Sequence, residues 1–137
     1  MLNDTNNGKT RIIQELVPGK QITLAHIIAN PDYEIYIKLG LDPAENHVGA
    51  IGIITITPAE TAIIAADLAT KASGVALGFV DRFSGTLIIT GSVSEVEAST
   101  HAVLDYISST LGFTVCPITK TWTKSSWLAE VVQAKQL

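Results

Sequence analysis

Residues 49–91 read GAIGIITITPAETAIIAADLATKASGVALGFVDRFSGTLIITG, and this stretch decides the predicted fold. Residues 49–57 are rich in β-branched side chains, which predicts a strand. The sequence Thr-Pro-Ala-Glu at residues 57–60 has the pattern of a capping box, so we expect a helix over residues 58–72. The stretch therefore begins as a strand followed by a helix.

The second part of this stretch predicts a β-hairpin. Two apolar segments, residues 75–80 and 86–90, are expected to pair as antiparallel strands. The connecting turn consists of Asp81, Arg82, Phe83, Ser84 and Gly85. This polar cluster is either a solvated turn or a loop that contacts another subunit or a ligand, and the residues alone leave both interpretations open.

A second helix and a closing strand follow the hairpin. Ser92 and Glu95 have capping-box spacing, and the residues up to about Leu111 carry an apolar face of helical period. Gly112 is expected to end this helix, and residues 113–118 are expected to form the closing strand.

One apolar segment and one short helix are predicted before residue 49. Residues 22–29 fit either a strand or a helix, and a strand is favoured. Asn30 suits an N-cap, Pro31 suits the first helical position, and Gly40 can end the helix. Residues 41–48 are then expected to form a loop.

The order strand, helix, strand, strand, helix, strand predicts a single α/β (α+β) domain. We expect a four-stranded sheet with helices on one face, and the ferredoxin-like sandwich, which shares this order, is the alternative. The domain is predicted to span residues 11–121. Residues 1–10 are polar and predicted to be disordered, and residues 122–137 form an extension that is either a short helix or disordered.

The composition excludes several classes of protein. The formal net charge is −4 and no basic cluster occurs, which argues against binding to nucleic acid. A single cysteine, Cys116, cannot form an intrachain disulfide. Residues 1–10 lack the apolar core of a signal peptide, and no apolar run approaches the roughly 18 residues of a membrane helix. We therefore expect a soluble, cytosolic protein that does not bind a membrane. The mean hydropathy of +0.33 indicates either a dense α/β core or apolar faces buried between subunits, and the second is favoured.

The residues predict no catalytic, cofactor or metal site. His26, His47 and His101 lie in three different predicted elements, without the convergent spacing that metal ligands need. Cys116 is expected to pack as a small apolar side chain. No glycine-rich phosphate loop or nucleophile elbow is present. Lys71 has the i, i+4 spacing of a helical surface ion pair with the preceding acidic residue.

Three long strings carry a resemblance to a known family: RIIQELVPGKQITLAHIIANP, AIGIITITPAETAIIAADLATKASGVALGFVDRFSGTLIITGSVSEVE and FTVCPITKT. Together they resemble bacterial microcompartment shell proteins, and more narrowly the circularly permuted, single-domain proteins of ethanolamine, propanediol and choline utilisation. The resemblance implies a homohexamer that tiles with itself and with other shell proteins around encapsulated enzymes, in a bacterial microcompartment shell in the cytoplasm. Such a shell retains a volatile aldehyde intermediate.

The resemblance also implies roles for particular residues. Lys71 matches the lysine at the hexamer edge, and the turn of Asp81, Arg82, Phe83, Ser84 and Gly85 becomes a candidate subunit contact. Gly49, Ala50 and Ile51 are the candidates for lining a central pore, because small residues let six backbones approach. The segment expected to form a six-stranded barrel over that pore is Arg11, Ile12, Ile13, Gln14, Glu15, Leu16 and Val17. Hexamers of this family also depart from sixfold symmetry.

The chain departs from the family pattern at its end, where WTKSSWLAEVVQAKQL follows the last matching residue. This extension is either a frayed tail or a helix that docks on the shell or its cargo. The alternative function is a small-molecule-binding regulatory oligomer of ferredoxin-like fold, with its ligand near Asp81, Arg82 and Ser84. The compartment to which the chain belongs is not decided by its residues.

Overall fold

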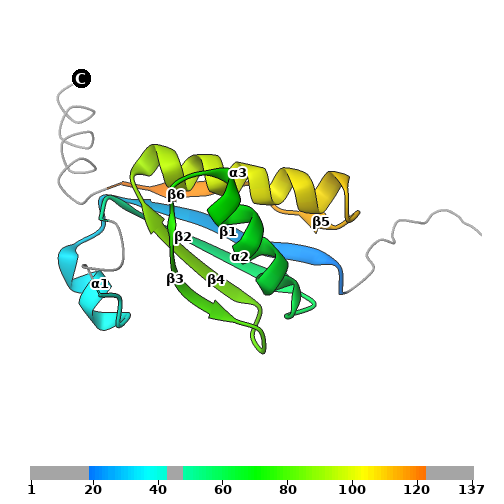
Figure 1. The fold of residues 1–137 in the computed structure, drawn as a ribbon, viewed down its shortest axis with the longest axis horizontal. Helices are drawn as coiled ribbons and strands as arrows, with labels where there is room; N and C mark the ends of the chain where they lie inside the picture. The colour runs from blue at the N-terminus through cyan, green and yellow to red at the C-terminus, as the bar shows by residue number, and fades with distance from the viewer. Residues whose placement is uncertain (1–18, 43–47, 123–137) are drawn as a thin grey trace, which may run out of the picture.

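The structure of the protein is a computed structural model, which describes residues 19–42 and 48–122. A six-stranded mixed sheet runs through this part, in the order β3-β4-β2-β1-β5, with β6 also paired to β1 (Figure 1). Its strands are β1 (Gln21–Ala29), β2 (Ala50–Thr57), β3 (Ala76–Asp81), β4 (Thr86–Gly91), β5 (Thr114–Val115) and β6 (Thr119–Thr121). β5 and β6 run parallel to β1, and the other neighbours are antiparallel.

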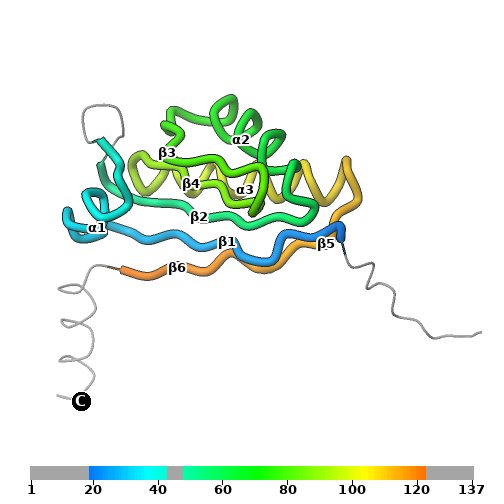
Figure 2. Tube along the Cα trace, turned by 90° about the horizontal axis from the view of Figure 1, so that it is seen from below, coloured from blue at the N-terminus to red at the C-terminus, as the bar shows by residue number. Residues whose placement is uncertain are grey.

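Helices cover the sheet unequally. Figure 2 shows α2 (Thr61–Ala72) and α3 (Val93–Ser109) together on one face, whereas the short α1 (Tyr33–Lys38) lies beyond one end of β1 and β2. None of these described helices has the length and apolar character needed to cross a bilayer. The predicted pair of long helices on one face is therefore confirmed.

Alternation along the strands separates two apolar clusters. The main core lies between the sheet and the two long helices and includes Ile22, Ala25, Ile27, Ile54, Ile56, Ala65, Ala69, Leu87, Ile89, Val96, Val103 and Ile107. On the opposite face, Ile51 and Ile88 pack with Tyr36 and Leu41, which come from α1 and the residues after it. Each fully buried aliphatic side chain contributes roughly 1.5–3 kcal/mol, so both faces help to hold β2 in place.

The described sheet has six strands and not the predicted four. Residues 22–29 form a strand, as favoured, but β1 lies inside the sheet, between β2 and the pair β5 and β6. The predicted closing strand over residues 113–118 is interrupted, because only Thr114–Val115 and Thr119–Thr121 pair with β1. Pro117 lies in the gap and has no N–H to donate, which explains the break.

Two of the three predicted helix starts are wrong. Thr57 does not cap α2, because it belongs to β2 and pairs with Gln21; the N-cap is Glu60, without a side-chain hydrogen bond. Asn30 is not an N-cap either, since its φ is +51° and its N–H donates to Gly49 O at 2.7 Å.

The third start, at Ser92, is confirmed. The N–H of Glu95 donates to Ser92 Oγ at 3.1 Å, and the N–H of Ser92 donates to Glu95 Oε1 at 3.0 Å. Three segments with predictions lie outside the described residues: residues 1–18, residues 43–47 with His47, and residues 123–137.

Candidate assembly surface

The turn between β3 and β4 is organised around the carboxylate of Asp81. The N–H of Phe83 donates to Asp81 Oδ1 at 2.8 Å, and the hydroxyl of Ser84 donates to Asp81 Oδ2 at 2.8 Å. These bonds, first of all the one from Phe83, lower the pKa of Asp81 below its ordinary value of 3.8. Both carboxylate oxygens of Asp81 thus accept hydrogen bonds from residues of the turn itself.

Gly85 closes the turn against β2. Its φ is +78°, a region that L-residues rarely adopt, and a Cβ at this position would overlap the carbonyl oxygen of Ile56. The N–H of Ile56 donates to Gly85 O at 2.8 Å, and the N–H of Gly85 donates to Asp81 O at 2.8 Å. The turn therefore has one well-defined shape, and it presents the side chains of Arg82 and Phe83 outward.

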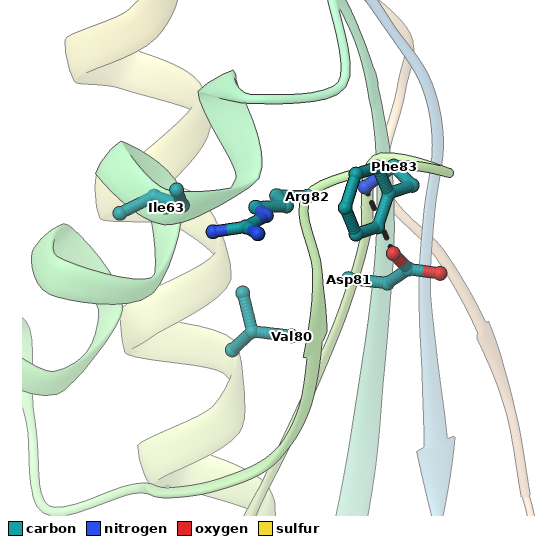
Figure 3. A pocket seen from close by; sticks show the side chains of 5 residues that line it. All are labelled: Ile63, Val80, Asp81, Arg82 and Phe83. Carbon is teal, nitrogen blue, oxygen red and sulfur yellow. Dashed lines mark hydrogen bonds between the residues drawn. The ribbon is translucent and has the colours of Figure 1, made fainter.

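A shallow pocket of about 330 Å³ lies beside this turn, lined by Ile63, Val80, Asp81, Arg82 and Phe83. In Figure 3, the side chains of Ile63, Arg82 and Val80 point toward a common space next to α2. The guanidinium carbon of Arg82 is 4.9 Å from the centre of the Phe83 ring, within the range of a cation–π contact. Phe83 itself is 80% exposed.

Large apolar side chains near the β3 edge of the sheet are exposed on both of its faces. Leu77 and Val80 lie on the helix side with their partners Ile89 and Leu87, and Phe79 lies on the opposite side with Ile88. We call this set the β3 edge surface: Ile63, Leu77, Phe79, Val80 and Phe83. Each of them leaves more than a third of its surface exposed. β3 is an edge strand of the described sheet, and a soluble monomer rarely exposes so many large apolar groups around one strand. This surface is suited to protein contact.

Lys71 lies in the last turn of α2 and forms the expected i, i+4 ion pair. Its Nζ is 2.9 Å from Asp67 Oδ2, and both side chains are well exposed. An exposed pair of this kind is worth only a few tenths of a kcal/mol. Lys71 is therefore not required for the fold of the domain and is available for contact.

Two of the three predicted pore residues, Ala50 and Ile51, do not face solvent in the single chain. Ala50 and Ile51 have no exposed surface, because Ala50 belongs to the main core and Ile51 packs against Tyr36. Gly49 donates its N–H to the hydroxyl of Tyr36 at 3.2 Å. In the single chain, Ala50 and Ile51 therefore expose no side chain that could line a pore, and the pore-lining role stays a prediction. The nearly unbroken apolar run of β2 is typical of a strand buried on both faces, which agrees with this burial.

The histidines and the cysteine are separate from the turn. His26 lies between the hydroxyls of Thr119 and Thr121, at 2.6 and 3.1 Å, and thereby ties β6 to β1. His101 is exposed on α3, and Cys116 is half-buried against the main core. Within residues 19–42 and 48–122, no group of three or more His, Cys, Asp or Glu side chains is placed to hold a metal ion.

Comparisons with known proteins agree on one family. The family described as "BMC domain" matches residues 50–119. The bacterial microcompartment shell protein CutR of Streptococcus intermedius is 52% identical over 111 residues, which are 81% of this chain and 92% of that protein. The shell protein PduU of Salmonella typhimurium is 53% identical over 111 residues, 81% of this chain and 93% of that protein.

A solved structure of CutR, described as "CutR flat hexamer, form 1", has the same fold. It aligns with a TM-score of 0.71 at 51% identity and covers 82% of this chain and all of the CutR chain. The similarity therefore extends over nearly the whole described domain.

Proposed function

This chain is a shell protein of the bacterial microcompartment (BMC) domain family, and we propose that six copies of it form a flat tile of such a shell. The family is structural and non-catalytic. One observation carries the proposal. A solved relative that is 51% identical, and whose whole chain aligns with 82% of this one, is described as a flat hexamer.

In the proposed role, the tile is one part of a wall around enzymes that handle a volatile aldehyde in choline, ethanolamine or propanediol catabolism. Tiles join edge to edge, and Lys71 is the contact between neighbouring tiles. The exposed position of Lys71 at the end of α2 supports this role, since its ion-pair partner is an exposed carboxylate on the same helix. Other shell proteins and encapsulated enzymes are the further partners.

Residues 11–17 are proposed to close into a small barrel over the centre of the tile. This segment lies outside the described residues, and the support is the resemblance of the string RIIQELV to shell proteins. A barrel leaves no exposed strand edge, which a lone strand would have. The alternative function, a small-molecule-binding regulatory oligomer, is not supported by the relatives, which are described as shell proteins.

The native mass of the purified chain tests the proposal, with negative-stain images of the same sample. We expect a mass six times the 14.5 kDa of one chain, and sheets or tubes at high protein concentration. A stable monomer, or a discrete oligomer smaller than a hexamer, at high concentration would overturn the proposed tile.

A further inference from the structure

The short helix α1 leaves most of its large apolar side chains exposed. Only Tyr36 of this helix is buried, in the apolar cluster on the sheet face opposite α2 and α3. We call the exposed apolar residues of α1 and its C-cap the α1 surface: Tyr33, Ile35, Ile37 and Leu39. Tyr33 and Ile37 expose more than half of their surface. So many exposed apolar groups on so short a helix are typical of a surface that another element covers.

The described chain ends close to this surface. β6 runs parallel to β1, and its last residue, Thr121, pairs with Ile28. β1 ends one residue later and leads through a short link into α1. Figures 1 and 2 both show the orange end of β6 at the same end of the sheet as α1. Residues 123–137, which follow the exposed Trp122, therefore start at the end of the sheet that carries the α1 surface.

Side chains hold β6 from both faces of the sheet, although this strand has only three residues. On one face, the ring of His26 lies between the hydroxyls of Thr119 and Thr121, at 2.6 and 3.1 Å. On the face covered by α3, Lys120 Nζ forms an ion pair with Glu97 Oε2. A short strand near a chain end would fray without such contacts. These contacts fix the point from which the following residues leave the sheet.

Residues 123–137, TKSSWLAEVVQAKQL, have the pattern of a helix with one apolar side. Ser125 or Ser126 suits the N-cap of such a helix. The large apolar residues recur at helical spacing: Trp127, Leu128, Val131 and Val132. A helix of this length is marginal in water by itself, so its apolar side needs a partner surface.

The other two segments outside the described residues are less suited to the α1 surface. Residues 1–18 join the chain before Gln21, at the end of β1 that lies away from α1. Residues 43–47, PAENH, follow soon after α1 but contain no large apolar side chain. Only residues 123–137 combine a start at this end of the sheet with an apolar helical pattern.

We propose that residues 123–137 fold back on their own chain as a helix whose apolar side packs against the α1 surface. A helix of residues 125–137 is about 20 Å long, twice the roughly 9 Å of α1, so it covers the α1 surface from end to end. The contact buries Trp127 and places a second helix beside α1 on the sheet face opposite α2 and α3. It lies within one chain and goes beyond the proposed hexamer, on which it does not depend.

The fluorescence of Trp127 tests the contact. The chain has two tryptophans, so Trp122→Phe leaves Trp127 as the single reporter. We expect its emission to be protected from acrylamide in the native chain, and Ile37→Glu to raise the quenching to the value measured in urea. Lys38→Glu is the matched control, because Lys38 is the next residue of α1 and is exposed, and the protection should persist. Since Ile37 is exposed too, its variant should fold, which cooperative urea unfolding verifies.

Crosslinking distinguishes the chain's own α1 from that of a second copy. Cys116→Ala removes the one native cysteine. In this background, a short bismaleimide should bridge Ile37→Cys with Val131→Cys inside one chain, so that the denatured mass stays that of a single chain. Ile64→Cys with Val131→Cys is the control and should not be bridged, because Ile64 is exposed on α2, which covers the other face of the sheet.

Three results would overturn the proposal. Native quenching of Trp127 equal to that in urea means that the segment does not dock, and protection that survives Ile37→Glu means that it docks elsewhere. A bridge between two chains means that the α1 surface binds a second copy. None of these readouts uses the native mass, so a failure of the proposed hexamer is recognised separately.

Discussion

Replacing Gly85 by alanine should destabilise the domain more than an equivalent change elsewhere, because two separate penalties apply at this position. The left-handed backbone, with φ of +78°, costs an L-residue about 1–2 kcal/mol. The new Cβ also overlaps Ile56 O, so that the turn must shift and lose its bonds from Ile56 N–H and to Asp81 O, at about 1 kcal/mol each. We expect a loss of about 3–4 kcal/mol in the free energy of unfolding.

Gly40 offers a matched control for this change. Its φ of +74° is nearly the same, but nothing lies within 4 Å of the position that a Cβ would take. Gly40→Ala should therefore cost about 1–2 kcal/mol, and the effect on the unfolded chain is the same in both variants. The difference of about 2 kcal/mol measures the close approach of the turn to β2.

Urea unfolding at one protein concentration measures both variants, with the native mass recorded for each. With an m-value of about 2 kcal/mol/M, the midpoint should fall by about 1.5–2 M for Gly85→Ala and by about 0.5–1 M for Gly40→Ala. Equal shifts for the two variants would refute the argument that contact with Ile56 O determines the shape of the turn.

Three further predictions concern a helix cap, a carboxylate and the proposed tile edge. Ser92→Ala should lower the free energy of unfolding by about 1 kcal/mol, because it removes the acceptor for the Glu95 N–H, whereas Ser94→Ala should have little effect in the same urea assay. Because the pKa of Asp81 is lowered in the folded chain, its carboxylate stabilises the turn above its ordinary pKa, and this stabilisation is lost as the pH falls through the lowered value. Asp81→Asn should therefore lose less stability than the wild type between about pH 5 and about pH 3, and an identical loss in both proteins would contradict this. Lys71→Ala should keep the hexamer mass but reduce sheets and tubes in negative-stain images; Asp67→Ala breaks the same ion pair but keeps the lysine, so its lattice should persist.

Elements with strong local signals were predicted within a few residues of their observed bounds. The predicted helix over residues 58–72 is observed as Thr61–Ala72, and the strand over residues 75–80 as Ala76–Asp81. The capping box of Ser92 and Glu95 is present as expected. In these cases the side-chain pattern and the cap act over a few residues, so the information is contained in the segment itself.

Predictions failed where a local capping signal competed with a contact to residues distant in the sequence. Thr57 has the residue type of a cap, but its backbone pairs with Gln21 in the sheet, and this pairing moves the helix start to Thr61. Asn30 suits a cap as well, but it adopts a left-handed conformation that directs its N–H to Gly49. A partner distant in the sequence decided both outcomes.

The sequence by itself determined the family, the order of the central elements and the lack of an enzymatic motif, because these depend on residue identity and on short-range periodicity. Only the tertiary structure decided that β1 lies inside the sheet, that Ala50 and Ile51 are enclosed, and that residues from α2, β3 and the turn line one pocket. These outcomes depend on which strands pair and on which side of each strand remains uncovered. Such pairings join residues far apart in the chain, as His26 and Thr119 show, and a local pattern does not specify them.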